Sequence, residues 1–456
     1  MEQVRQLRAS ARDHLLLHFT RAGAWRSEAL PVIVRGEGCY VYDDAGRRFL
    51  DGLSGLFCVN IGHGRSDIAA AAAKQMEVLA YATNWSAAHP SAIEAAELIA
   101  SLAPGDLDYV FFVNSGSEAV ESAIKFCRQY QRSRGFPART KVIGREWAYH
   151  GTTLGALSLT GIPHYREPFT PLLEGFLHVP NTLGAEVPPG GHARDLPCLR
   201  AIEALIEREG PETVAAIFAE PVQNGRGALV PPAGYWQALR AICDRNGILL
   251  VADEVINSFG RLGSWFGVER EGVVPDLVTF AKGATSGYAP LGGFICRRPL
   301  VEQLLESPDS SFLHGATWGG HPVATTTAVS NITALRSEKI LDNVNEHAGY
   351  FRRELEALVR THTILKEIRG TGYFYALELT ADRDSGEELA AEQSRLLLQQ
   401  VLPAAMRKVG LLTRPDDRGA TMLMLAPPLI ADRAVLDELV GQVDAVLDEA
   451  AHAIGR

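Results

Sequence analysis

The chain has 456 residues and lacks any uninterrupted apolar run of about 18 residues, the length that a membrane-spanning helix needs. Its first residues, MEQVRQLRASARDHLLLHF, contain scattered charges and no continuous apolar core, which argues against a signal peptide. We therefore expect no membrane partner and a cytoplasmic location.

Cysteine is also scarce. The six cysteines lie far apart, and no two of them form a CxxC pair. This spacing indicates neither a zinc knuckle nor a disulfide framework, and it fits a reducing compartment. We expect no metal site.

Basic residues are fewer than acidic ones, with 44 Lys and Arg against 54 Asp and Glu, so the net charge is −10. A generally acidic surface argues against nucleic acid or anionic lipid as the main partner. The 46% of apolar residues and the length of the chain predict a large globular protein, with one large domain and a smaller one.

What the sequence does contain is a regular alternation of short apolar runs and amphipathic segments. The runs are apolar throughout, as expected for strands that are covered on both faces. Strand–helix alternation predicts an α/β fold with a mostly parallel central sheet flanked by helices. We expect strands at 109–113, 141–144, 214–219, 248–252, 277–281 and 292–296, and helices at 117–133 and 234–246.

The pattern changes after about residue 325. Long helical segments there surround short strand-like pieces, which predicts a smaller α+β domain. A hairpin is expected around Asp44–Gly46, within an N-terminal segment that joins the smaller domain or lies against the larger one. We predict an N-terminal segment over 1–65, a large cofactor-binding domain over 66–325 and a small domain over 326–456. In the C-terminal part the expected helices are 322–336, 339–360, 389–409 and 432–453, and the expected strands are 373–379 and 421–425.

Ligands of open α/β sheets bind beyond the carboxyl ends of the strands, so polar residues at those ends are candidates for a site. In FFVNSGSEAVESAIK (111–125) a strand leads into a helix through Ser115, Gly116 and Ser117. Backbone N–H groups at this helix start are suited to an anion such as phosphate. Simple helix capping by Ser115 or Ser117 explains the same residues.

Three further strand ends carry reactive or flat side chains. Asp253 ends the apolar run GILLVAD, and a carboxylate there needs a cation or several hydrogen bonds. A helix cap or an ion pair would serve, and so would a protonated ring nitrogen. Lys282 ends LVTFAK, and a lysine with a suppressed pKa forms a Schiff base with an aldehyde. With Tyr149 as a stacking surface, this set matches the needs of pyridoxal phosphate.

The same residues occur in long motifs that resemble the class III, or omega, aminotransferases of the fold-type I pyridoxal-phosphate enzymes. The resemblance covers nearly the whole chain. The motifs, in order, are RGEGCYVYDDAGRRFLDGLSGLFCVNIGHG, NSGSEAVESAIK, AYHGTT, AEPVQNGRG, VADEVINSFGRLG, TFAKGATSGYAPLGG, HGATWGGHPVA and LAPPL.

The resemblance implies a role for each matching position. Lys282 would bind the cofactor aldehyde and carry the proton, and Asp253 would hold the pyridine nitrogen protonated. Val255 and Tyr149 would enclose the ring. The remaining cofactor contacts that the resemblance implies are Ser115, Gly116, Ser117, Glu220 and Thr317, the last reaching the phosphate of the partner subunit. For Glu220 an indirect position beside the site is an equal alternative.

For the substrate, the resemblance to amine and β-amino acid:pyruvate transaminases implies aromatic walls from Phe57 and Trp85, although both could be ordinary core residues. A mobile arginine would pair with the substrate carboxylate, because guanidinium binds carboxylates bidentately. Arg414 in GLLTRPDDRGATMLMLAPPL is the candidate, and Arg418 is its rival. Asp416 or Asp417 could tether either arginine. INSFGR departs from the commoner ICGFGR, so Asn257 and Ser258 alter pocket polarity.

We therefore expect an aminotransferase that moves an amino group from an amine or an omega- or β-amino acid to pyruvate by a ping-pong mechanism. A homodimer with shared active sites is expected, which could form half of a tetramer. The alternatives are use of 2-oxoglutarate with a 4-aminobutyrate or diamine donor, and an intramolecular aminomutase of the glutamate-1-semialdehyde type. A non-enzymatic protein that retains the cofactor fits the intact lysine and carboxylate poorly.

Overall fold

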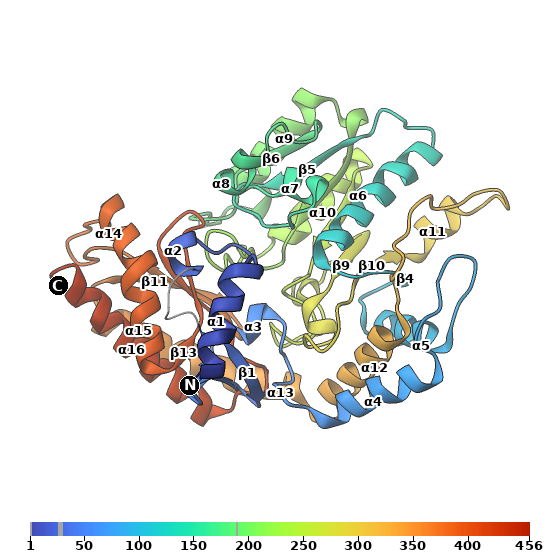
Figure 1. The fold of residues 1–456 in the computed structure, drawn as a ribbon. Coiled ribbons are helices and arrows are strands. Elements are labelled where there is room, and N and C mark those ends of the chain that lie inside the picture. Colours follow the sequence, from blue (N-terminus) through green and yellow to red (C-terminus); the bar gives the residue numbers. More distant parts are fainter. Residues whose placement is uncertain (1, 26–30, 188–189) are drawn as a thin grey trace.

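A seven-stranded sheet forms the centre of the computed structural model, which describes residues 2–25, 31–187 and 190–456 (Figure 1). The order of its strands is β4-β10-β9-β8-β7-β5-β6, and β10 alone runs antiparallel to its neighbours. The predicted α/β fold with a mostly parallel sheet is confirmed. The strands are β4 (Leu107–Val113), β5 (Lys141–Arg145), β6 (Phe176–Val179), β7 (Val214–Ala219), β8 (Leu249–Asp253), β9 (Leu277–Phe280) and β10 (Gly292–Arg297).

All six strands that the sequence predicts are present, and β6 is an additional edge strand. Every residue of β7, β8 and β9 is buried, because helices cover both faces of the sheet. This explains why these strands are apolar throughout instead of alternating.

The helix that follows β4 begins where local side chains satisfy free backbone groups. The Ser115 hydroxyl accepts a hydrogen bond from the backbone N–H of Glu118, and the Glu118 carboxylate accepts one from the N–H of Asn114. This reciprocal cap starts α6 at the end of β4. The helices of residues 2–304 are α1 (Glu2–His14), α2 (Ala22–Trp25), α3 (Ser54–Phe57), α4 (Ser66–Val78), α5 (Pro90–Leu102), α6 (Gly116–Ser133), α7 (Leu154–Leu159), α8 (Pro163–Arg166), α9 (Pro197–Glu209), α10 (Tyr235–Asn246) and α11 (Arg298–Leu304).

The C-terminal part adds a second, antiparallel sheet of order β11-β12-β15-β14, with helices packed against it. Three of the four predicted C-terminal helices, those over 322–336, 339–360 and 432–453, are present as single α-helices. The elements are α12 (Pro322–Ser337), α13 (Ile340–Thr361), β11 (Leu365–Thr371), β12 (Phe374–Leu379), α14 (Ala391–Leu396), α15 (Leu402–Val409), β13 (Leu411–Leu412), β14 (Arg414–Asp416), β15 (Met422–Leu425) and α16 (Arg433–Ala453).

The segment predicted as one helix over 389–409 is not a uniform α-helix. A π-helical turn over Leu397–Val401 separates α14 from α15. Pro403 lacks the N–H that an α-helix would direct to the carbonyl of Gln399, so the wider turn replaces that bond.

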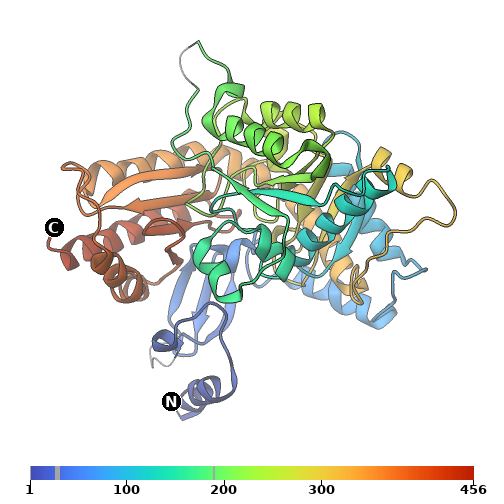
Figure 2. The ribbon, with the colours of Figure 1, turned by 90° about the horizontal axis from the view of Figure 1, so that it is seen from above.

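The N-terminal strands pair with the C-terminal part of the chain. β1 (Ile33–Glu37), β2 (Tyr40–Asp43) and β3 (Arg48–Asp51) form an antiparallel sheet, and β13 adds to β3 in parallel. The predicted hairpin joins β2 to β3, with the Asp43 carboxylate accepting the N–H groups of Ala45 and Arg47. Figure 2 shows these blue strands beside the orange and red C-terminal elements. The domain boundaries at 65 and 325 stay a prediction, and residues 1 and 26–30 of the first segment lie outside the described residues.

Candidate active site

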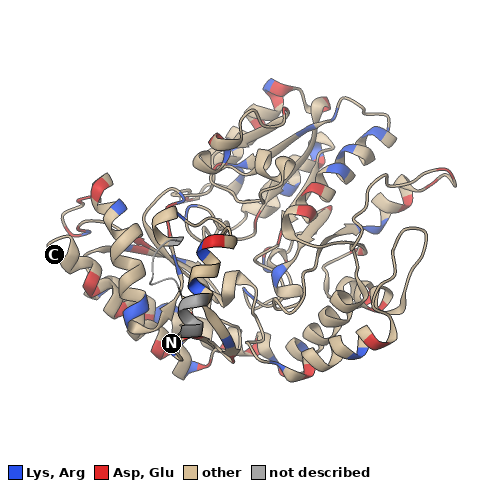
Figure 3. Ribbon diagram, viewed as in Figure 1, with Lys and Arg blue, Asp and Glu red and all other residues tan. Residues whose placement is uncertain are grey.

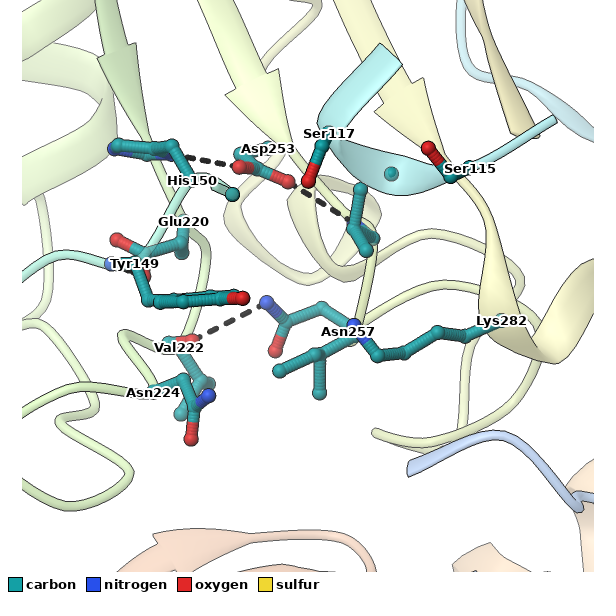
Figure 4. A pocket seen from close by; sticks show the side chains of 14 residues that line it. Ser115, Ser117, Tyr149, His150, Glu220, Val222, Asn224, Asp253, Asn257 and Lys282 are labelled. Carbon is teal, nitrogen blue, oxygen red and sulfur yellow. Dashed lines mark hydrogen bonds and ion pairs between the residues drawn. The ribbon is translucent and has the colours of Figure 1, made fainter. Parts of the chain in front are cut away.

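One cavity lies at the carboxyl ends of the parallel strands, and it brings together eight of the predicted site residues (Figure 4). We call it the inner cavity. Its walls follow β4, β5, β7, β8 and β9, whose carboxyl ends lie at the same edge of the sheet. The predicted residues that line it are Ser115, Gly116, Ser117, Tyr149, Glu220, Asp253, Val255 and Lys282.

Lys282 lies two residues beyond the end of β9 and projects into the cavity (Figure 4). Its backbone has a left-handed φ of 40°, which turns the chain sharply as the strand ends. Burial lowers the pKa of its ammonium, and the nearby Cys58 and Asp253 oppose this shift without cancelling it. Its Nζ forms no hydrogen bond or ion pair with any other described residue, so the amine is available for reaction.

Asp253 is the last residue of β8, and its carboxylate is held from two sides. Oδ2 lies 2.6 Å from Nδ1 of His150, and Oδ1 accepts hydrogen bonds from the Thr279 hydroxyl at 3.0 Å and the Val255 N–H at 3.2 Å. His150 was not among the predicted site residues. Because a carboxylate only accepts, Nδ1 carries the proton in this contact. Its Nε2 is buried and has no partner among the described residues.

The start of α6 forms the opposite side of the cavity. Ser115 acts as the cap, as the simpler interpretation predicted. The N–H groups of Gly116 and Ser117 donate to no other described residue, which leaves them available to an anion. A side chain at Gly116 would not fit, because its Cβ would lie 2.7 Å from a methyl group of Val255. The Ser117 hydroxyl accepts the N–H of Thr152 at 3.1 Å and so ties the helix start to the loop after Tyr149.

Glu220 positions Tyr149 through the backbone. Its Oε1 accepts the Tyr149 N–H at 3.3 Å, and its Oε2 pairs with the buried Arg145 at 3.0 Å. Burial raises the pKa of Tyr149, so its ring is a neutral phenol above the cavity. Glu220 thus lines the cavity and supports a neighbouring residue, and its direct contact with a cofactor stays a prediction.

Asn257 makes the inner cavity more polar, as predicted from the difference between INSFGR in this chain and the commoner ICGFGR. Its Nδ2 donates to the carbonyl of Val222 at 3.2 Å, while its Oδ1 is buried without a partner among the described residues. Ser258 is tied to the backbone instead, because its hydroxyl donates to the carbonyl of Glu254. Only Asn257 of this pair lines the cavity.

A second, larger cavity adjoins the first and shares Tyr149, Asn224, Ile256 and Lys282 with it. We call it the outer cavity. Phe57 lines it but is 2% exposed and packs edge-on against Phe374, with 5.5 Å between ring centroids. Phe57 is thus both a wall of the cavity and a core residue.

The two candidate arginines both line the outer cavity, and Asp416 contacts both of them. Nε of Arg418 donates to both Asp416 oxygens at 2.8 Å, and its Nη2 donates to Asn224 Oδ1 at 3.2 Å. Arg414 is held more loosely, with Nη2 at 3.1 Å from the Tyr165 hydroxyl and Nε at 3.6 Å from Asp416. Asp417 pairs elsewhere, with Arg21 and His164. Arg414 is therefore the arginine that is free to move.

Two predicted residues lie outside both cavities of this chain. Trp85 is 66% exposed, and Thr317 is exposed in a neighbouring segment whose Gly315 lies against the Trp85 indole. The Thr317 carbonyl accepts a hydrogen bond from the Tyr81 hydroxyl at 2.7 Å. Neither side chain reaches Lys282 within one subunit.

Comparison with known proteins identifies a family whose chemistry agrees with the residues of the inner cavity. The sequence matches the class III aminotransferase family over residues 22–447. The chain belongs to the class III aminotransferases. The predicted family, enzyme class and fold are thereby confirmed. Within the described residues, no helix has the length and apolar character that a bilayer crossing requires.

Two relatives show how close the similarity is. A probable aminotransferase of Mycobacterium tuberculosis is 44% identical, and the match covers 96% of this chain and 93% of that one. The putrescine–pyruvate aminotransferase of Pseudomonas aeruginosa is 37% identical, over 99% and 98% of the two chains.

Solved structures agree over the full length. An (S)-enantioselective omega-transaminase from Thermomicrobium roseum has a TM-score of 0.92 and 40% identity, with 98% of each chain covered. The omega-transaminase of Pseudomonas jessenii, solved in complex with PMP, has a TM-score of 0.89 and 30% identity, with 98% of this chain and 99% of that one covered.

Proposed function

We propose that this class III aminotransferase is a pyridoxal-phosphate-dependent omega-transaminase that moves an amino group from an amine or an omega- or β-amino acid to pyruvate. The observation that carries the proposal is the pairing of an unbonded lysine of lowered pKa with a firmly held carboxylate in one cavity. The name of the Pseudomonas aeruginosa relative, which uses pyruvate, supports the acceptor.

The inner cavity has the chemical groups that this cofactor requires. The free N–H groups of Gly116 and Ser117 suit its phosphate, the Asp253 carboxylate suits its ring nitrogen, and the Lys282 amine suits its aldehyde. Tyr149 and Val255 provide flat and branched surfaces for the two ring faces. When bound, the group withdraws electrons from the substrate carbon that loses a proton.

Lys282 then has two tasks, to bind the aldehyde and to move the proton. Its lowered pKa favours the neutral amine, which is the form that attacks a carbonyl and accepts a proton. Asp253 would hold a proton at the ring nitrogen, and His150 and Thr279 keep its carboxylate in place.

Arg414 binds the carboxylate of the keto acid in this proposal. Its single hydrogen bond to Tyr165 and its side-chain exposure of 28% allow it to turn toward an anionic substrate and away from an apolar one. Arg418 is too firmly bonded to Asp416 for such movement.

We further propose a homodimer in which Thr317 and Trp85 complete the site of the partner subunit. Both are exposed and belong to a surface rich in exposed apolar side chains, which usually marks an interface. The exposed apolar residues of the two segments 76–85 and 313–318 are Met76, Val78, Tyr81, Trp85, Leu313 and Trp318.

The main proposal is tested with the two half-reactions measured separately. Purified protein is loaded with pyridoxal phosphate, mixed with an amine and followed by absorbance, and pyruvate is then added and alanine quantified by mass spectrometry. We expect loss of the aldehyde-form absorbance with the amine and its return with pyruvate. Turnover without any keto acid would instead support the aminomutase alternative. Turnover only with 2-oxoglutarate would support the alternative of a 4-aminobutyrate or diamine donor with 2-oxoglutarate as acceptor.

A further inference from the structure

The outer cavity is strongly basic although the protein is acidic overall. Among the described residues, its lining carries four arginines and one carboxylate, Asp417, which is already paired with Arg21 and His164. Figure 3 shows both charge signs spread over the outer helices, with basic positions also in the central region between the two sheets. The arginines of the lining are Arg21, Arg407, Arg414 and Arg418, and Lys282 adds an amine whose lowered pKa favours the neutral form.

Arg418 is the most firmly fixed of these cations. Its side chain is 1% exposed, and Asp416 and Asn224 hold its Nε and Nη2. Burial by itself would raise the pKa of Asp416, but Arg418 outweighs this effect and lowers it to about 2, so the pair stays ionised. The backbone is fixed as well, because the Arg418 carbonyl accepts the N–H of Arg226.

Two donors of this cluster remain unused. Because Arg418 can only donate, the oxygen of the Asn224 amide must face it, and the Asn224 Nδ2 therefore points elsewhere. Neither Asn224 Nδ2 nor Arg418 Nη1 donates to another described residue, yet both side chains line the outer cavity and are more than nine-tenths buried. Both donor atoms face the open space of the cavity, where an anionic ligand group could accept from them in place of water.

We propose that Arg418 and Asn224 form a fixed oxyanion subsite, distinct from the mobile Arg414, which binds the distal carboxylate or sulfonate of an omega-amino acid donor. The inference rests on the proposed function and narrows its donor. Asp416 holds Arg418, which in turn holds Asn224, so the two donors cost little ordering on binding. A distal ammonium would instead meet N–H groups without a described acceptor and the nearby positive charge of Arg414. This chain therefore selects omega-amino acids over diamines.

The test uses three donors of equal chain length that differ in distal charge: 4-aminobutyrate, butylamine and putrescine. With pyruvate as acceptor, kcat/KM should fall in that order for the wild-type holoenzyme. Arg414 contributes to this order as well, so the diagnostic quantity is the change of the 4-aminobutyrate to butylamine ratio in variants of the fixed subsite.

Two variants remove the subsite. The first also removes the 3.6 Å contact between Asp416 and Arg414, so the ratio is measured in an Arg414→Leu background as well, where that contact plays no part. Asp416→Asn combined with Arg418→Gln removes both charges together, so no buried charge is left unpaired. It should lower the ratio by about 10- to 100-fold, the range for a lost hydrogen bond to a charged group, while butylamine turnover changes little. Asn224→Ala should lower it by about 3- to 10-fold. The matched control, Arg407→Gln, removes a lining charge outside the subsite and should change the ratio less than about twofold.

The outcomes separate the two proposals. An unchanged ratio in both variants, or wild-type preference for putrescine, would overturn the subsite while leaving the transaminase intact. If none of the three amines is turned over, the proposed function fails, and calorimetry with the holoprotein still decides the subsite, because 4-aminobutyrate should bind more tightly than butylamine. Thermal melting of each variant verifies that it is folded.

Discussion

The inner and outer cavities share four lining residues but are built in different ways. The inner cavity is made by residues that directly follow strands of one sheet, so their positions depend on adjacent strand ends. The outer cavity is made by segments near residues 18–24, 56–57, 164–165, 398–407 and 414–418, which the fold brings together from distant parts of the chain. The comparison separates the proposed reaction centre, built on one sheet, from the proposed substrate-selecting region, built from distant segments.

The largest effect on activity is expected from a substitution in the inner cavity. Lys282→Ala should lower kcat by at least about 1,000-fold, because no other amine lines the inner cavity to bind the aldehyde or carry the proton. Steady-state transamination measures this loss, and circular dichroism should show an unchanged fold. Lys74→Ala, at an exposed ion pair with Glu77, serves as the control. Retention of a tenth of the activity would contradict the role of Lys282.

A substitution in the outer cavity is expected to have a smaller effect on activity, and to change KM instead of kcat. Arg414→Leu should raise the KM for pyruvate by about 10- to 100-fold through loss of a charge-assisted contact, with the half-reaction of a neutral amine nearly unchanged. Stopped-flow measurement of each half-reaction separates the two. Equal losses in both half-reactions would show that Arg414 supports the fold and not the keto acid.

The smallest effect is on stability. The pKa of Lys282 is lowered in the folded protein, so between that value and the ordinary 10.5 the unfolded chain holds a proton that the folded chain has lost. Burial of the amine therefore costs stability at neutral pH, and the cost disappears as the pH rises above 10.5. The cofactor-free Lys282→Met variant should be more stable than wild type at pH 7 by about 1 kcal/mol.

Urea unfolding at pH 7 and at pH 9.5 checks this prediction, because the advantage of Lys282→Met should shrink at the higher pH. A constant difference at both values would mean that packing, and not the charge, is responsible. The same experiment on Arg407→Gln, at the edge of the outer cavity, supplies the comparison.

The sequence predicted the inner cavity better than the outer one for a physical reason. Lys282 and Asp253 each terminate an apolar run, so a local pattern identifies them, and the parallel sheet then brings them together. His150 was missed because its contact with Asp253 joins residues 103 positions apart. Its position after a predicted strand could have identified His150, because it directly follows Tyr149, which was selected on that basis.

The outer cavity offered no comparable pattern. RPDDRG identified a cluster of charges, but the choice between Arg414 and Arg418 depended on Asn224 and Tyr165, which lie far away in the sequence. The π-helical turn at 397–401 was also hidden, because the amphipathic pattern around it is that of a continuous helix. Such features follow from packing and not from local preference.

The pairing of β3 with β13 also affects how the protein is made. The N–H of Leu50 donates a hydrogen bond to the carbonyl of Gly410. The edge of β3, which is synthesised early, therefore pairs with β13, which is synthesised near the end of translation. At about 5–20 residues per second the ribosome needs tens of seconds to deliver that partner. Throughout this interval the nascent chain exposes an unpaired edge, and chaperones that shield such edges should govern the yield of active enzyme.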